Sequence, residues 1–409
     1  MVDYPKDWEE IYLGNYNEIT SSKRVFEKEW ETKGIPFLRT RDIASYHLKE
    51  EQKDKIYISR ETYKCKVIAS GEPQKGDLLV TGVGSIGLPF LIETDNKIYF
   101  KDGNIIWVKQ SDSLFPKYLY YLFLSNLIKN QIINSSGFTT VGTFTIKNAK
   151  KIKILKPSIK EQKAIAETLM TFDRHLETLE RLIQKKKMVR DGAVEDLMTG
   201  KTRLDDFDYE WETVNFEDVI IPKARIGWQG LKKDEYLSSG YSYLISGTDF
   251  YNGTITFDNI SYVSKDRYDL DKNIQVTSGD VLVTKDGTIG KVAIVPKIDK
   301  KATLNSGVFV FKTNELLFGN FLYWTLRSNI FENFIDKLSA GSTIMHLYQK
   351  DLKKLYFYIP KDIQEQKAIA DILTSMDEEL ENLEKEKAKV EKIKAGAMED
   401  LLTGRIRLI

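Results

Sequence analysis

The sequence predicts an α+β protein in which two mainly-β domains alternate with two long α-helices, as an approximate internal two-fold repeat. Two observations predict it: a 44-residue segment occurs twice, and short β-rich runs precede each copy. Residues 161–204 return without a gap as residues 365–408, with 22 of 44 positions identical at an offset of 204. The chain of 409 residues therefore holds two copies of one plan.

Each copy of the repeat has the periodicity of a long helix. Apolar residues step by four and three along both copies: Ile165, Leu169, Phe172, Leu176, Leu179 and Ile183, then Ile369, Leu373, Met376, Leu380 and Leu383. Gly200 and Gly404 stand where helix ends are expected, which gives a helix about 57 Å long at roughly 1.5 Å per residue. So narrow an apolar stripe needs a partner stripe. Two separate oligomerisation helices are one reading; because the stripes match, we interpret them as an intramolecular coiled coil.

The segments ahead of the helices are mainly β, with one shorter helix expected in each, at about 117–132 and 319–335. β-rich runs are separated by Gly, Pro, Asn and Asp: 56–58, 78–80, 98–100, 105–108 and 152–155, then 281–283, 292–295, 308–311 and 355–358. We therefore divide the chain into β-rich domains at 1–156 and 205–359, and helical regions at 157–204 and 360–409.

Composition indicates a soluble globular protein of two or three domains. Hydrophobic residues make up 42% and charged residues 30% of the chain, and no window is apolar enough for a membrane span. The N-terminus lacks a signal-peptide pattern, so we expect a cytoplasmic protein. One cysteine, Cys65, excludes a disulfide framework and is expected to be buried or inert. Three scattered histidines supply no dedicated zinc site.

The net charge of +1 is unusual for a protein that binds nucleic acid by itself. Residues 1–156 carry 24 basic and 19 acidic residues, whereas residues 205–359 carry 18 and 21. Either DNA is not the ligand, or partner subunits supply much of the phosphate contact. Charge alone leaves both readings open.

Duplicated glycine-rich segments at 76–87 and 279–290 raise the question of catalysis. Thr288-Ile289-Gly290-Lys291 resembles the end of a P-loop, but Val292 replaces the required Ser or Thr. A strand that runs into a glycine turn close to a ligand and a plain hairpin turn fit equally well. Other catalytic motifs, including the one that amino-methylating DNA methyltransferases carry, are missing. We expect the chain to catalyse nothing alone.

Together, these residues resemble the specificity subunit of type I restriction-modification systems. The resemblance is carried by Trp8-Glu9 and Trp211-Glu212, by the Gly-Asp-x-Leu-x-Thr segments with their Gly-x-Ile-Gly ends, and by the Glu-Gln-x-x-Ile-Ala helix starts. Residues 34–43 also look like the family's segment after the first variable stretch. Residues 240–249 are a looser version without its two arginines.

The resemblance implies two target recognition domains, each reading one half of a split DNA sequence, and two helical regions that pair antiparallel. It also implies two methyltransferase subunits, docked on the helical regions, that bring S-adenosylmethionine. ATP-dependent restriction subunits, with ATP and Mg, would join them. The chain itself would need no cofactor and would hold no metal. A tandem-domain scaffold for a peptide or sugar, and a self-contained DNA nuclease, are the alternatives.

Two sets of site residues follow. DNA contacts need Arg, Lys, Asn, Gln, Ser or Thr on exposed segments. The DNA-binding candidates are Lys23, Arg24, Arg39, Arg41, Thr81, Ser85, Thr139, Thr140, Lys223, Arg225, Trp228, Gln229, Ser246, Thr248, Lys285, Thr288, Ser342, Thr343 and His346. The partner-docking candidates lie in the repeats: Glu161, Gln162, Ile165, Asp196, Arg203, Glu365, Gln366, Ile369, Asp400 and Arg407. Helix capping and packing would also explain the second set.

Overall fold

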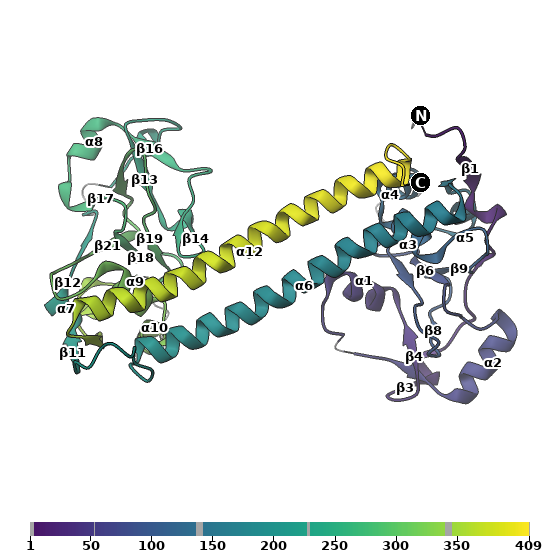
Figure 1. Cartoon of the computed structure of the whole chain (residues 1–409), viewed down its shortest axis with the longest axis horizontal. Coiled ribbons are helices and arrows are strands. Elements are labelled where there is room, and N and C mark those ends of the chain that lie inside the picture. The colour runs from purple at the N-terminus through teal and green to yellow at the C-terminus, as the bar shows by residue number, and fades with distance from the viewer. Residues whose placement is uncertain (1–3, 53, 136–141, 227–229, 340–345, 409) are drawn as a thin grey trace. The chain divides into compact units, whose positions relative to one another are not determined.

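The structure is a computed structural model that describes residues 4–52, 54–135, 142–226, 230–339 and 346–408. It divides into two compact units. Unit 1 contains residues 1–180 and 385–409, and unit 2 contains residues 181–384. The two long helices, α6 (Ile159–Met198) and α12 (Ile363–Thr403), therefore each contribute one part to each unit (Figure 1).

Unit 1 contains a two-stranded sheet and two four-stranded sheets, antiparallel except for the parallel pair β4–β8. The two-stranded sheet pairs β1 (Glu9–Tyr12) with β10 (Lys153–Lys156). The first four-stranded sheet has the order β2 (Ile19–Thr20), β9 (Ile105–Val108), β6 (Leu78–Thr81) and β7 (Pro89–Leu91). The second has the order β3 (Trp30–Glu31), β5 (Tyr57–Ile58), β4 (Ile35–Leu38) and β8 (Tyr99–Phe100).

Unit 2 has a similar arrangement with β13–β20 as the parallel pair, but the additional edge strand of its second four-stranded sheet lies on the opposite side of that pair. The strands are β11 (Trp211–Asn215) and β22 (Tyr356–Pro360); β12 (Ile220–Ala224), β21 (Val308–Thr313), β18 (Val281–Thr284) and β19 (Val292–Ile294); β16 (Ser261–Val263), β13 (Ser242–Ile245), β20 (Lys301–Leu304) and β17 (Gln275–Val276). A hairpin of β14 (Phe250–Tyr251) and β15 (Thr254–Ile255) is added. All nine predicted β-rich runs coincide with strands.

Each domain contains several shorter helices, whereas one was predicted for each. They are α1 (Thr40–Leu48), α2 (Arg60–Ser70), α3 (Pro116–Leu124), α4 (Asn126–Ser135) and α5 (Ile146–Lys150), then α7 (Phe216–Val219), α8 (Lys265–Asp269), α9 (Gly319–Leu326), α10 (Asn329–Ser339) and α11 (Gln349–Leu352). The single helix expected at 117–132 is two helices, because Ser125 has an extended backbone. The one expected at 319–335 is likewise divided, between α9 and α10.

The apolar stripe of each long helix serves two purposes. Ile165 and Leu169 are fully buried in the core of unit 1 with Tyr118 and Leu122 of α3, so the start of the stripe packs on the domain. Ile369 and Leu373 do the same in unit 2. Farther along the helices, Leu179 and Leu380 are also buried. The predicted coiled-coil seam therefore begins only after the first two turns.

Ion pairs within each unit give the direction of the helix pair. In unit 1, Asp173 of α6 pairs with Lys394 of α12 at 2.5 Å, and Glu180 pairs with Lys387 at 3.0 Å. In unit 2, Lys186 of α6 pairs with Glu379 of α12 at 2.7 Å, and Arg190 pairs with Asp377. Residue numbers rise along α6 as they fall along α12, which confirms the antiparallel intramolecular coiled coil.

Three predictions from composition can be set against the structure. No helix within the described residues is long and apolar enough to cross a membrane. The described ranges also contain no group of three or more His, Cys, Asp or Glu side chains placed to hold a metal ion. Cys65 was expected to be buried or inert, and the first alternative is wrong, because it lies on α2 with its side chain exposed. It faces outward because Tyr63, not Cys65, fills the core side of that helix.

Candidate nucleic-acid interface

The duplicated glycine segments form the same hairpin turn in both units. Thr284, at the end of β18, donates its hydroxyl to the carbonyl of Thr288 at 2.5 Å and accepts the N–H of Lys291 at 2.9 Å. Thr81 makes the same pair of bonds, to Ser85 and Leu88. Each turn leads into another strand, β7 or β19, rather than into a helix. This geometry excludes a P-loop, because in both units the segment is a hairpin turn between two strands.

Glycine is required where each turn reverses. Gly84 and Gly287 have φ of 72° and 71°, values in the left-handed region that favours glycine. A Cβ at Gly87 would lie 2.9 Å from Ile132 on α4, and one at Gly290 would lie 3.1 Å from Ile335 on α10. The turns therefore sit against the α4 and α10 helices while their tips, at Ser85 and Thr288, are exposed.

Three other segments converge on the turn in unit 1. Gly82 donates its N–H to the carbonyl of Asn104 at 2.8 Å, and its carbonyl accepts the N–H of Phe144 at 2.8 Å. The hydroxyl of Ser21 donates to the carbonyl of Ile105 at 2.8 Å and accepts the N–H of Gly103 at 3.1 Å. These bonds hold segments from four places in the chain beside one another at the turn.

Unit 2 assembles the equivalent surface with the same kinds of contact. Lys285 donates its backbone N–H to Gly307 at 2.9 Å, and its carbonyl accepts the N–H of Leu347 at 2.8 Å. A Cβ on Gly247 would lie 2.9 Å from Cγ2 of Thr284, so the segment after β13 also borders the turn. We define the turn surface of each unit as the exposed residues of these converging segments.

Several DNA-binding candidates lie on the turn surfaces. In unit 1 they include Lys23, Arg24 and Ser85, all exposed; Arg24 pairs with Asp102 at 3.2 Å. Arg41 is exposed at the start of α1, 3.5 Å from Asp54. Those in unit 2 are Lys223 and Lys285, which are half-buried, with Ser246, Thr248, Thr288 and His346. Nδ1 of His346 lies 2.7 Å from a carboxylate oxygen of Asp286 in the turn.

The structure gives Arg39 and Thr81 internal roles, which corrects their selection as DNA contacts. Arg39 is 8% exposed, and its guanidinium makes two bonds of 2.8 Å to the carboxylate of Asp42 and one of 2.6 Å to the carbonyl of Asp54. It caps α1 and orients the loop at Asp54. Thr81 is fully buried beneath the turn. Neither side chain is free to reach a base edge.

Arg225 is also buried, against the expectation of an exposed contact. Its Nε donates to the carbonyl of Leu304 at 3.0 Å, while Nη1 and Nη2 are buried and have no hydrogen-bond partner among the described residues. Burial lowers the pKa of Arg225, and the neighbouring Arg267 lowers it further. The side chain lies behind the turn surface and does not form part of it.

Six DNA-binding candidates lie outside the described residues: Thr139, Thr140, Trp228, Gln229, Ser342 and Thr343. Sequence reasoning also missed residues that the fold brings to the turn surfaces. The loop at 101–104 and the loop at 305–307 each contact a turn, directly or through a neighbour. In the sequence, each of these loops is marked only by a short polar stretch between two β-rich runs, which is a weak indication of a functional segment.

The starts of the long helices were expected to dock partners, and the structure corrects this. Glu365 is fully buried; Arg203 donates Nε and Nη2 to its carboxylate at 2.8 and 3.0 Å, and the indole N–H of Trp211 donates at 3.1 Å. In unit 1, Glu161 is bound in the same way by Arg407 and Trp8. These carboxylates fasten the domain, the helix start and the opposite helix's tail together.

The neighbouring glutamines are equally internal. The side-chain carbonyl of Gln162 accepts the N–H of Phe115 at 2.8 Å, and its amide donates to the carbonyl of Pro157 at 2.9 Å. Gln366 repeats both bonds with Phe318 and Pro360. Ile165 and Ile369 are buried in the two cores. The identity of these residues between the copies therefore reflects packing and helix-start hydrogen bonds.

The helix ends keep part of their side chains at the surface. Asp196 pairs with Lys201 at 2.7 Å, and Asp400 pairs with Arg405 at 2.9 Å. Arg203 and Arg407 have side chains 33% and 32% exposed, with the remaining area covered by Glu365 and Glu161. Of the docking candidates, only these ends present a surface to a partner.

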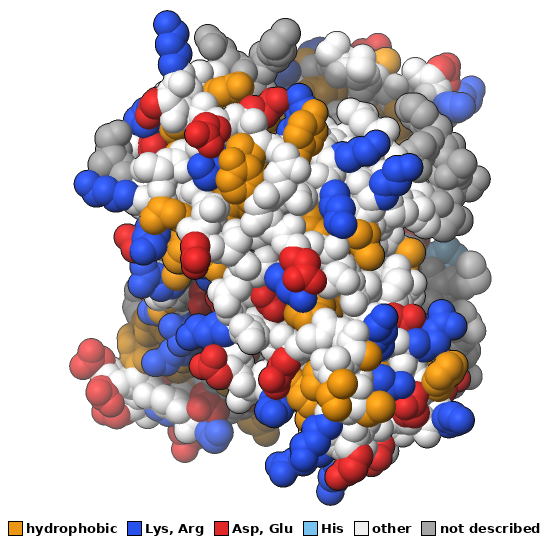
Figure 2. Space-filling model, turned by 90° about the vertical axis from the view of Figure 1, so that its right-hand side faces the viewer, with side chains coloured by type: hydrophobic (Ala, Val, Ile, Leu, Met, Phe, Trp, Pro, Cys, Tyr) orange, Lys and Arg blue, Asp and Glu red, His pale blue; other side chains and the backbone are white. Residues whose placement is uncertain are grey.

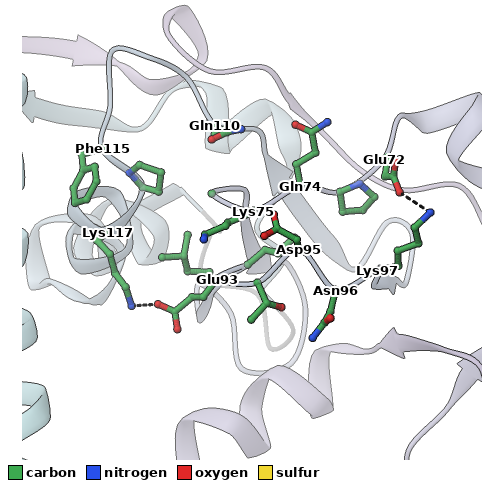
Figure 3. Close-up of a pocket in the computed structure, with 16 residues that line it drawn as sticks. Glu72, Gln74, Lys75, Glu93, Asp95, Asn96, Lys97, Gln110, Phe115 and Lys117 are labelled. Carbon is green, nitrogen blue, oxygen red and sulfur yellow. Dashed lines mark ion pairs between the residues drawn. The ribbon is translucent and has the colours of Figure 1, made fainter.

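A pocket of about 770 Å³ in unit 1 is a rival site (Figure 3). Its wall includes Lys117 paired with Glu93 and Lys97 paired with Glu72, shown by the dashed lines. With Lys75 and Asp95, three cations face three anions. Because these charges cancel, the pocket offers no net attraction to a phosphate backbone. Figure 2 shows the face on the right-hand side of Figure 1, where blue and red side chains are interspersed rather than gathered.

Comparison with known proteins identifies the family. The family model for the type I restriction modification DNA specificity domain matches the chain twice, at residues 5–187 and 209–392. The chain belongs to this family. Each match covers one copy of the repeated plan, so this type I DNA specificity subunit has two recognition domains, one in unit 1 and one in unit 2.

Relatives agree along almost the whole chain. The specificity subunit of the type I restriction enzyme MjaVIII from Methanocaldococcus jannaschii is 28% identical over 428 residues, 99% of this chain and 94% of that protein. The EcoBI specificity subunit from Escherichia coli is 21% identical over 393 residues, 90% of this chain and 79% of that protein. The S subunit structure from M. genitalium has a TM-score of 0.61 at 16% identity, covering 98% of both chains, and supports the fold.

Proposed function

We propose that each recognition domain of this type I specificity subunit reads one half of a bipartite DNA target through its turn surface. The long helices would fix the number of unread base pairs between the half-sites and would dock methyltransferase subunits. The chain itself would be a recognition subunit without catalysis of its own, acting in the cytoplasm.

One observation carries this proposal: the same turn surface occurs in both units with different polar residues. The turn reads Gly82-Val83-Gly84-Ser85 in unit 1 and Lys285-Asp286-Gly287-Thr288 in unit 2. A shared backbone geometry with different side chains suits two readers of different base sequences, because bases are distinguished by side-chain donors and acceptors. Lys285 and Thr288 in unit 2 correspond in the repeat to Gly82 and Ser85 in unit 1.

The exposed and half-buried candidates around the turns, together with Arg41 on α1, would supply the contacts. Lys23, Arg24 and Arg41 in unit 1, with Lys223 and Lys285 in unit 2, are suited to phosphate or guanine. Ser85, Thr288 and the Ser246–Thr248 segment are suited to either purines or pyrimidines through their hydroxyls. With so few cations, the domains alone would bind DNA weakly at physiological salt, since phosphate contacts supply most of the affinity.

Methyltransferase subunits would therefore supply the remaining DNA contacts and catalyse the methyl transfer. They would carry S-adenosylmethionine, and restriction subunits would add ATP and Mg. We propose that the methyltransferase subunits dock on exposed apolar residues at equivalent positions of the two long helices. Val189 is 51% and Ile393 is 48% exposed, although each lies on a helix whose buried face is already filled. Such a pair offers one equivalent contact to each of two partners.

The test is to co-express this chain with the methyltransferase subunit of the same system and to sequence adenine methylation in DNA that the complex has modified. A split motif with two short specified halves and a constant gap is expected. Exchange of residues 82–85 for the sequence at 285–288 should then change the bases read in one half only. Methylation that ignores sequence, or a single continuous motif, would contradict the proposal.

A further inference from the structure

One carboxylate in each long helix links its recognition domain to the helix pair. Asp173 in α6 and Asp377 in α12 occupy equivalent positions of the repeat, 204 residues apart. Each lies past the stretch of helix that is buried in the domain core, near the point where the helix leaves the domain. Both side chains hold two partners at once.

In unit 1, Asp173 lies between α3 and α12. One oxygen accepts the phenol O–H of Tyr121 at 2.5 Å, and the other accepts Nζ of Lys394 at 2.5 Å. Burial raises the pKa of Tyr121 and its bond to Asp173 raises it further, so the phenol remains a donor. Nζ of Lys394 also lies 6.0 Å from the centre of the Tyr121 ring. A domain residue and the opposite helix thus meet at one carboxylate.

In unit 2, Asp377 lies between α9 and α6. One oxygen accepts Nη1 of Arg327, at the end of α9, at 2.6 Å, and the other accepts Nη1 of Arg190. Arg327 also donates to the hydroxyl of Tyr323 and lies 4.8 Å over the ring of Trp324. Its side chain is 22% exposed, so these bonds are largely shielded from water.

The cation on the opposite helix is retained between the copies, but the domain's donor is not. Arg190 and Lys394 are 204 positions apart, like the two aspartates. In the α3 and α9 segments, by contrast, Arg327 aligns with Leu124, and Tyr121 aligns with Trp324. Each domain therefore reaches the same carboxylate with a different side chain. A link retained by different means in two diverged domains points to the link itself as the required feature.

Glu180 of α6 also reaches its domain, because it pairs with Lys49 as well as with Lys387 of α12, but another ion pair joins only the two helices. Lys186 and Glu379 join α6 to α12 at 2.7 Å, and within the described part of the chain neither side chain pairs with α9. Such a pair stabilises the two helices against each other but does not restrain the domain. Glu379 is two residues from Asp377 on the same helix, which makes it a matched control.

We propose that Asp173 and Asp377 are positioning residues that hold each recognition domain at a fixed angle on the helix pair and thereby set the spacing between half-sites. This inference rests on the proposed function. A restrained domain would accept one separation between the two half-sites, whereas a domain that pivots on its apolar core would accept neighbouring separations as well.

The test uses the assembled methyltransferase complex with Asp377→Asn, Asp173→Asn or the control Glu379→Gln. Its substrates are duplexes that carry both half-sites at the native gap or at gaps one base pair shorter and longer. We expect each aspartate variant to lose about tenfold in preference for the native gap, the scale of one charge-assisted hydrogen bond. Discrimination against a mismatched base in either half-site should remain, and Glu379→Gln should keep the wild-type gap preference.

Two milder variants keep the test decisive if an asparagine variant does not fold. Tyr121→Phe removes only the phenol bond in unit 1, and Arg327→Leu installs the residue type found at the aligned position of unit 1. Either should broaden the accepted gap. A gap preference as narrow as the wild type in all folded variants would overturn the inference. Wild-type methylation without a bipartite motif would instead overturn the proposed function.

Discussion

Arg203→Met tests whether the buried carboxylate at the start of α12 depends on the helix tail that follows α6. The substitution keeps the aliphatic stem beside Trp211 but removes the bonds of 2.8 and 3.0 Å to Glu365. Glu365, with no exposed side-chain area, would keep one side-chain donor, the indole of Trp211 at 3.1 Å. The variant therefore leaves a buried charge poorly compensated.

The size of the effect follows from that burial. Breaking a buried ion pair by removing one partner costs about 3–5 kcal/mol. Because the Arg203 side chain is 33% exposed, solvent already screens part of its interaction, and we expect about 2–3 kcal/mol for unit 2. Adding Glu365→Gln should restore roughly half of the loss, since the unpaired carboxylate is then neutral.

Native-state hydrogen exchange with mass spectrometry would measure this effect unit by unit, because a single unfolding midpoint does not separate two compact units. Amides at the start of α12 should lose protection in Arg203→Met, while those at the start of α6 should not. The reverse pattern is expected for Arg407→Met, which acts on Glu161 in unit 1. The reasoning is refuted if Arg203→Met changes protection at both helix starts equally, or by less than about 0.5 kcal/mol, below the usual scale of one hydrogen bond.

Three further predictions follow from the structure. Thr284→Val should destabilise unit 2 by about 1–3 kcal/mol in the same exchange experiment, because the turn loses two internal hydrogen bonds, and should impair reading of one half-site only. Val189→Glu combined with Ile393→Glu should reduce the methyltransferase that co-purifies with the chain, leaving its circular dichroism spectrum unchanged; undiminished co-purification would place docking elsewhere. The hydrogen bond from Lys49 lowers the pKa of Glu180 below its usual 4.5. The stability that this pair adds is therefore present above pH 4.5 and is lost as the pH falls through the lowered pKa. In an acid titration, Lys49→Met should lose less folding stability over this pH range than the wild type does.

Much of the architecture was predictable because it is written in local periodicity and in repetition. Steps of four and three placed both long helices to within a few residues, and β-branched runs such as 105–108 and 281–283 marked central strands. The breaks at Ser125 and after Arg327 were not predicted, although each falls at a Ser-Asn pair, whose residues favour helix N-termini, because the apolar runs on both sides continue. Helices α1 and α2 escaped it because their apolar residues are few.

The site was predictable by segment rather than by side chain. Sequence comparison of the two copies indicated the glycine turns, and both turns lie at the centre of a converging surface. Arginine as a residue type was less informative. Arg24 and Arg41 are exposed. Arg39 instead pairs with Asp42, three residues away, and the periodicity of the sequence does not reveal this ion pair. Composition states which residues can contact DNA, but burial decides which of them are available.

By itself, the sequence determined that the protein is an internal duplication, that each copy ends in a long helix, and that the chain resembles one family along its length. These features depend on residues near one another in the chain or on the comparison of two copies. Only the tertiary structure decided that Glu161 is an internal anchor and not a docking residue. Its partners are Trp8 and Arg407, and no local pattern records contacts made across 153 and 246 residues of separation.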